Sequence, residues 1–144
     1  MLRFLMSLLL GFAVCTPALV AGGLVEFLDG VIPEAPPNAK VLAGYGRIRN
    51  ATDGPLRIYA ASSPDFARVE FHRTSMRGGV MHMEELGRFA VPVGGFVEFR
   101  RGGLHLMLFE PKRPLRDGDK VRIDFSYASP QPMVATFDVK RAIP

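Results

Sequence analysis

The sequence predicts an all-β protein that folds as a single sandwich or barrel. Several short segments alternate apolar with polar residues, which is the period-two pattern of strands with one buried face. Turn sequences rich in glycine and proline separate these segments at intervals of roughly 8–12 residues, as in sandwiches and barrels. No segment shows a convincing helical period. The chain has 144 residues, 48% of them hydrophobic, which is enough for one domain with its own core.

The expected strands follow from these patterns along the chain. Alternation is clear at residues 68–72, 97–100, 121–127 and 135–139, and the other candidates are apolar runs between turn residues. In chain order the expected strands are residues 24–28, 40–48, 56–61, 68–72, 80–86, 97–100, 104–109, 121–127 and 135–139. The turns between them include 53–55, Gly78-Gly79, 92–95, Gly102-Gly103 and Asp117-Gly118.

Residues 30–39 are expected to form an extended loop. They contain Pro33, Pro36 and Pro37. Proline has no backbone N–H and a fixed φ, so three prolines in ten residues argue against regular structure.

Residues 1–22 are expected to be a secretory signal peptide, and residues 23–144 the mature β domain. Arg3 supplies the positive start, residues 4–14 are apolar and uncharged, and small residues follow from Ala18 to Gly23. A retained membrane anchor is the alternative, but the uncharged stretch is barely long enough to span a bilayer. Cleavage between Ala18 and Gly23 would export the protein to the periplasm.

Cys15 is the single cysteine and lies within this signal segment. Lipid attachment at Cys15 is disfavoured because Val14 precedes it where a small residue is expected. The mature chain is then expected to lack thiols, which excludes a blue-copper site because that site needs a cysteine thiolate. Asn50-Ala51-Thr52 matches the glycosylation acceptor pattern. In a bacterial exported protein we interpret that match as incidental.

The charge of the chain does not indicate a nucleic-acid-binding protein. The formal net charge is +4 and the pI is about 9.6. The basic residues are scattered along the chain, without a cluster or an aromatic stacking motif. We interpret them as solvated positions on sheet faces, with a possible role in docking a partner.

Two histidines and two methionines form the candidate metal site. Ten residues separate His72 from Met83, twenty-one separate Met83 from His105, and one separates His105 from Met107. All four side chains are neutral ligands, and the thioethers are soft donors that select copper(I) over zinc, iron or magnesium. The sequence therefore predicts one copper(I) ion per chain, bound without thiolate.

The predicted strands bring these residues toward one place. His72 ends a strand on the face opposite Val69 and Phe71, and the Gly78-Gly79 turn leads into the strand that carries Met83. A hairpin of this length is expected to place His72 and Met83 side by side. His105 and Met107 are two residues apart in one strand, so they share a face.

Other residues near this pattern are weaker candidates. Met76 and Met81 are expected to serve as packing, although spare thioethers are an alternative. His82 is expected on the other face of its strand, in a surface role. Glu84 and Glu85 are hard ligands that suit copper(I) poorly.

At these residues the chain resembles the periplasmic copper(I) chaperones that help load the binuclear copper centre of cytochrome c oxidase. Their pattern of His, ten residues, Met, twenty-one residues, His-x-Met is met by the four residues without a gap. The surrounding segments 69–72, 79–83, 102–108 and 114–119 agree, and similarity covers roughly residues 40–140.

The resemblance implies a cupredoxin-like Greek-key β-sandwich or barrel with a solvent-accessible copper(I) site. It also implies that the ligands are His72, Met83, His105 and Met107. A His/Met-rich tail that some relatives carry is absent from the sequence, so a second copper site is not expected.

The leading interpretation is a monomeric chaperone, not an enzyme, that passes copper(I) by ligand exchange to an oxidase subunit. Another copper carrier or a thiol reductase is a further candidate partner, and neither nucleic acid nor stable membrane insertion is expected. Copper binding is expected to weaken at acid pH, where histidines are protonated. A periplasmic copper-buffering or resistance protein and a metal-free envelope domain remain alternatives. The metal-free alternative predicts that His72 and His105 lie far apart.

Overall fold

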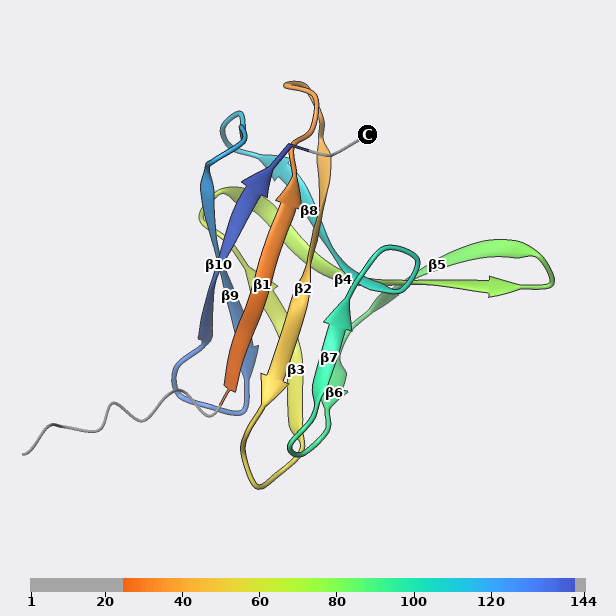
Figure 1. Cartoon of the computed structure of the whole chain (residues 1–144), viewed down its shortest axis with the longest axis vertical. Helices are drawn as coiled ribbons and strands as arrows, with labels where there is room; N and C mark the ends of the chain where they lie inside the picture. The colour runs from red at the N-terminus through yellow and green to blue at the C-terminus, as the bar shows by residue number, and fades with distance from the viewer. Residues whose placement is uncertain (1–24, 142–144) are drawn as a thin grey trace, which may run out of the picture.

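The computed structural model describes residues 25–141, and this part of the chain consists of ten β-strands without a helix (Figure 1). The expected signal peptide, its cleavage site and Cys15 lie outside the described residues. No helix that could cross a bilayer occurs within residues 25–141. The strands are β1 (Val25–Pro33), β2 (Val41–Asn50), β3 (Leu56–Ser62), β4 (Phe66–Arg77), β5 (Val80–Leu86), β6 (Phe89–Val91), β7 (Phe96–Phe99), β8 (Leu104–Pro111), β9 (Lys120–Tyr127) and β10 (Met133–Lys140).

The strands form one sheet that closes on itself. Its path runs β4-β8-β2-β1-β10-β9-β3, and β3 returns to pair with β4 at Ala61 and Val69. Three strands add to this barrel, with β5 on β4, β6 on β3 and β7 on β2. β1 and β10 are parallel, whereas the other paired strands are antiparallel. The prediction of an all-β sandwich or barrel is confirmed.

Phenylalanine rings fill the interior of the barrel. The ring of Phe27 lies 4.6 Å from that of Phe137 and 5.1 Å from that of Phe125, measured between centroids. Phe71 of β4 meets Phe89 of β6 edge-on at 5.0 Å. Aromatic pairs at such distances stabilise a core beyond their buried area. Because Phe71 is fixed inside, its neighbours in β4 must face outward.

The structure corrects two expectations about strands. Residues 30–33 belong to β1 and not to a loop, because Val31, Ile32 and Pro33 pair with β10, and Pro33 is the last residue of the strand. The backbone N–H of Glu34 then donates to the carbonyl of Lys140 at 2.7 Å. The strand β6 was not expected, since its three residues are too few for an alternating pattern.

The hairpin of β4 and β5 projects from the barrel as an arm (Figure 1). β4 runs from Phe66 to Arg77 and is longer than the five residues expected, while β5 matches the expected bounds. β8 accompanies β4 only as far as the Arg73–Leu104 pair, so the outer part of the arm is two-stranded. Gly78 and Gly79 have φ of 58° and 79°, which is the left-handed geometry of a type I′ turn.

Asn50 has a structural role that is incompatible with glycosylation in the folded state. Its side chain is fully buried, and Nδ2 donates to the carbonyls of Gly54 at 2.9 Å and Val91 at 3.1 Å. Oδ1 accepts from the backbone N–H of Thr52 at 3.0 Å. The asparagine therefore ties the β2–β3 turn to β6, which supports the interpretation of the acceptor pattern as incidental.

We predict that Asn50→Ala lowers the free energy of unfolding by about 1–3 kcal/mol, because it leaves the buried carbonyl of Val91 without its side-chain donor. Denaturant unfolding measures this change. The exposed Asn38 provides the control, and Asn38→Ala should change stability by less than about 0.5 kcal/mol. Equal effects of the two substitutions would contradict the role assigned to Asn50.

Candidate metal centre

The candidate ligands lie on the outer face of the sheet formed by β5, β4 and β8. In β8 the side chains of Leu104, Leu106 and Leu108 are buried in the core. The alternation of a strand therefore directs His105 and Met107 to the opposite face. Glu70 and His72 face outward in β4 for the same reason, since Phe71 between them enters the core.

The register of β4 and β8 places His72 directly opposite His105. Their ring centroids are 6.2 Å apart. Side chains directly opposite each other in neighbouring antiparallel strands share a face and have Cβ atoms roughly 4.5–5.5 Å apart. The metal-free alternative predicted a large separation of the two histidines, and that prediction is wrong.

Glu70 orients the ring of His72. The Nε2 of His72 lies 2.8 Å from a carboxylate oxygen of Glu70, so Nε2–H donates and Nδ1 carries the lone pair. Within the described part of the chain, Nδ1 is buried and has no hydrogen-bond partner. A buried nitrogen without a partner requires an explanation, and a metal ion is one ligand that would satisfy it. A carboxylate behind a histidine is a frequent arrangement around protein metal sites.

A backbone carbonyl orients the ring of His105, which is 6% exposed. Its Nδ1 lies 2.9 Å from the carbonyl oxygen of Gly103, so Nδ1–H donates and the lone pair is on Nε2. The same carbonyl accepts the backbone N–H of Thr74 at 3.0 Å. Gly102, with φ of 70°, makes the turn that leads into this position. Each histidine thus has one fixed nitrogen and one available lone pair.

Glu70 was not predicted as a site residue, although its position two residues before His72 in a strand places both on one face. The hydrogen bond from His72 lowers the pKa of Glu70, and the hydrogen bond and charge of Arg68 lower that pKa further. A lowered pKa means that this carboxylate stabilises the folded state above its ordinary value of 4.5. That contribution is lost as the pH falls through the lowered value.

The two thioethers are less closely placed than the histidines. Met107 lies opposite Glu70 of β4 and Ala43 of β2, and it is half-buried. Met83 lies opposite Thr74, on the face that also carries His72, and it is 55% exposed. Met83 is therefore a diagonal neighbour of His72, at a distance of roughly 7–8 Å, and not its direct partner. The expectation that the hairpin sets them side by side is corrected by this register.

The weaker candidates also have clear positions. Met76 and Met81 are 63% and 67% exposed, so the expectation that they serve as packing is wrong. They lie on the outer part of the arm, which β8 does not accompany, so no third strand covers them. His82 is exposed and pairs with Ser75 on the opposite face of the arm, which confirms its expected surface position. Glu85 is exposed and lies directly opposite His72.

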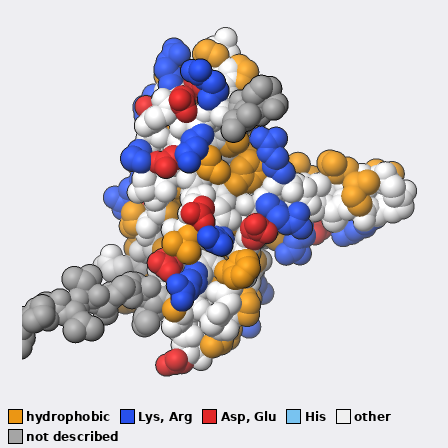
Figure 2. Space-filling model, viewed as in Figure 1, with side chains coloured by type: hydrophobic (Ala, Val, Ile, Leu, Met, Phe, Trp, Pro, Cys, Tyr) orange, Lys and Arg blue, Asp and Glu red, His pale blue; other side chains and the backbone are white. Residues whose placement is uncertain are grey.

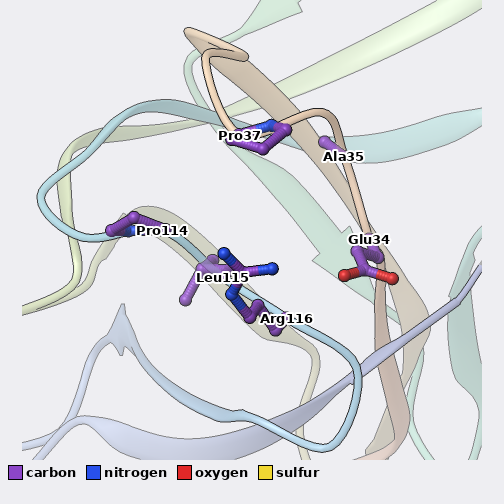
Figure 3. A pocket seen from close by; sticks show the side chains of 6 residues that line it. All are labelled: Glu34, Ala35, Pro37, Pro114, Leu115 and Arg116. Carbon is purple, nitrogen blue, oxygen red and sulfur yellow. The ribbon is translucent and has the colours of Figure 1, made fainter.

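Other parts of the described chain are weaker candidates for a metal site. Residues 25–141 contain no group of three or more histidine, cysteine or carboxylate side chains able to hold a metal ion. A pocket at the end of the barrel is lined by Glu34, Ala35, Pro37, Pro114, Leu115 and Arg116 (Figure 3). It lies beyond the C-terminal end of β8, whereas His105 lies near the N-terminal end, and it has no soft donor. Basic and acidic side chains are interspersed on the visible face of the barrel (Figure 2).

Comparison with known proteins identifies a family and a fold. The family described as "LpqE-like: Putative lipoprotein LpqE-like" matches residues 25–139. A relative from Leifsonia xyli subsp. xyli, "Putative lipoprotein Lxx21020", is 29% identical over 87 residues, which cover 60% of this chain and 52% of the relative. The chain thus matches about half the length of that curated relative.

Solved structures with the same fold include copper-binding domains. The copper-bound PCuAC domain from PmoF2 has a TM-score of 0.69 and 17% identity, covering 83% of this chain and 95% of that one. The copper(I) form of DR1885 from Deinococcus radiodurans has a TM-score of 0.67 and 25% identity, covering 88% and 85%. The expected cupredoxin-like β-barrel is confirmed by these likenesses.

We predict that Glu70→Ala releases the ring of His72 from its Nε2–H tautomer, because the acceptor that holds this proton is removed. Long-range NMR correlations between the ring nitrogens and the carbon-bound ring protons report the tautomer. In the metal-free protein, recorded where both rings are neutral, they should show mixed tautomers for His72 and an unchanged Nδ1–H tautomer for His105. Glu84→Ala, on the opposite face of the arm, is the control and should leave both rings unchanged. A His72 ring unaffected by Glu70→Ala would contradict the assigned contact.

Proposed function

The chain belongs to the LpqE-like family, and we propose that it is an exported copper(I) chaperone whose ligands are His72, Met83, His105 and Met107. The observation that carries this proposal is the facing pair of His72 and His105, each with one nitrogen fixed and one lone pair available. No enzymatic activity is proposed, because thioethers accommodate copper(II) poorly and the face offers no nucleophile with a base.

The donor set fits one monovalent soft ion. Two imidazoles and two thioethers are neutral, so these ligands leave the positive charge of copper(I) uncancelled. That charge is tolerable at a partly exposed face and would be costly in a dry core. Glu70 and Glu85, near His72 on the same face, supply negative charge without acting as ligands. Hard divalent ions would gain little from the thioethers.

The positions of the thioethers favour delivery by ligand exchange. Met83 is on the exposed arm, so its sulfur can leave the ion and be replaced by a cysteine or methionine of a recipient. The histidines hold the ion meanwhile, since their second nitrogens are fixed. We propose the binuclear copper centre of cytochrome c oxidase as the destination, on the strength of the sequence pattern of the four ligands.

The names of relatives and structural neighbours support the proposals that the protein binds copper and is exported. The names of two structural neighbours describe a copper-bound PCuAC domain and a copper(I)-bound DR1885. The family description as lipoproteins supports export, in agreement with a signal peptide over residues 1–22 and a domain over residues 23–144. The same description restores lipid attachment at Cys15 as the alternative to cleavage between Ala18 and Gly23.

We predict that the mature protein binds one copper(I) ion tightly, and that His72→Ala/Met107→Ala abolishes this binding. Anaerobic competition with a chromophoric copper(I) chelator measures the affinity. Binding should weaken as the pH falls into the acid range, because both imidazoles must be neutral to coordinate. Tight binding retained by the double variant would refute the ligand assignment.

The softness of the site has its own test. Met83→Ala and Met107→Ala should each weaken copper(I) binding far more than any zinc binding, because only the soft ion depends on the thioethers. Zinc titration of the same variants provides the comparison. Equal losses of affinity for both metals would contradict the proposal of a soft site.

Delivery is separated from buffering by a transfer experiment. The copper(I)-loaded protein is mixed with an apo copper-binding domain of an oxidase, and metal transfer is followed anaerobically. A chaperone should transfer copper faster than it releases copper to an excess of chelator, because exchange proceeds through a shared intermediate. Transfer limited to the rate of spontaneous release would favour the buffering or resistance protein instead.

A further inference from the structure

The arm carries three exposed methionines on one face, and two of them have no role in the proposed copper site. Met76 and Met81 are directly opposite each other in β4 and β5, and Met83 follows two residues after Met81 on the same face. We infer that Met76 and Met81, with Met83, form an outer site for a soft monovalent cation, which shares Met83 with the histidine site. The inference rests on the proposed function and adds a second, weaker position to its single tight one.

The arm is amphipathic in a way that favours this site. Met76, Met81 and Met83 share a face with Thr74, whereas Arg73, Arg77, His82 and Glu84 belong to the opposite face. On that opposite face Arg77 and Glu84 form an ion pair of 3.9 Å. Beyond His72, the thioether face of the arm therefore holds neither a basic side chain nor an imidazole. Figure 2 shows hydrophobic side chains, the class that includes methionine, exposed on the arm.

The hairpin geometry brings the two outer sulfurs within reach of one ion. Gly78 and Gly79 form a two-residue turn, so Arg77 and Val80 are the hydrogen-bonded pair that closes it. Pairs alternate along antiparallel strands, which makes Met76–Met81 a non-hydrogen-bonded pair with Cα atoms about 4.5 Å apart. Side chains are closest at such pairs, and methionine has three rotatable bonds with which to orient its sulfur.

Exposure of these side chains has no packing explanation. Met76, Met81 and Met83 are 63%, 67% and 55% exposed, and the arm beyond Arg73 pairs with no third strand. Three large apolar side chains that stay exposed to water contribute no hydrophobic stabilisation to the fold. As thioethers, however, they are soft donors accessible to an incoming ion.

The arrangement also gives a direction of movement. Same-face positions along a strand are roughly 7 Å apart, so Met76–Met81, then Thr74–Met83, then His72 form successive steps toward the barrel. The outer site offers thioethers alone, whereas the inner site adds two imidazoles and should bind more tightly. Met83 belongs to both steps, so an ion can move inward by exchange of one ligand at a time without being released.

The experiment isolates the outer site in a His72→Ala/His105→Ala variant of the mature protein. Silver(I) is the probe because it is soft, monovalent and not oxidised on handling. The methyl resonances of Met76, Met81 and Met83 should shift with about one equivalent of silver(I), since the remaining thioethers suffice to bind it. Adding Met76→Leu and Met81→Leu should abolish the shift of Met83 and the bound equivalent. His82→Ala, on the opposite face, is the matched control and should retain both.

The outcomes separate this inference from the proposed function. Methyl resonances that stay unchanged, or binding that survives both leucine substitutions, would overturn the outer site. If the unsubstituted protein still binds one copper(I) ion tightly, the histidine site stands without it. Leucine at two exposed positions should leave the fold intact, and denaturant unfolding checks this.

Discussion

The pairing register between β4 and β8 is the constraint on which the site depends. It is fixed from the core side, where Phe71 and Val69 of β4 meet Leu106 and Leu108 of β8. Because side chains alternate, that packing leaves His72 opposite His105 on the outer face. A slip of one residue would bury the histidines and expose the leucines, so the hydrophobic core enforces the geometry of the metal face.

The proposed site combines fixed nitrogen donors with an exposed sulfur donor on the arm, Met83. Glu70 and the carbonyl of Gly103 fix the tautomers of the two histidines before any ion arrives. Met83 has no comparable restraint, because it lies on the arm just past the last residues that β8 accompanies. A carrier needs both properties. Fixed imidazoles reduce the ordering that binding requires, and an exposed thioether can leave first when a recipient supplies its own ligand.

Local pattern predicted much of this arrangement, and long-range pairing accounts for most of the remainder. The bounds of β5 and the outward direction of His105 and Met107 follow from alternation and turn residues in the sequence. Alternation alone does not give the register within a hairpin, but the two-residue Gly78-Gly79 turn does, and counting back from it places Met83 opposite Thr74 and not beside His72. Glu70 was not predicted because a carboxylate is not a soft ligand. Its role comes from its contacts with His72 and Arg68.

The exposure of the thioethers suits the charge of the proposed copper(I) cargo. A monovalent ion bound by neutral ligands keeps its charge, and moving that charge into the barrel would require desolvation without compensation. The structure instead places the proposed donors at the junction of barrel and arm. There the hydrogen bond from the Thr74 N–H to the carbonyl of Gly103, just before β8, is the last link between β4 and that strand. Inward of this link the donors are rigid and nitrogen-rich, and outward they are exposed and sulfur-only. If the proposed sites bind as argued, the affinity for a soft ion rises along the same face on which the ion remains accessible to water and to a partner.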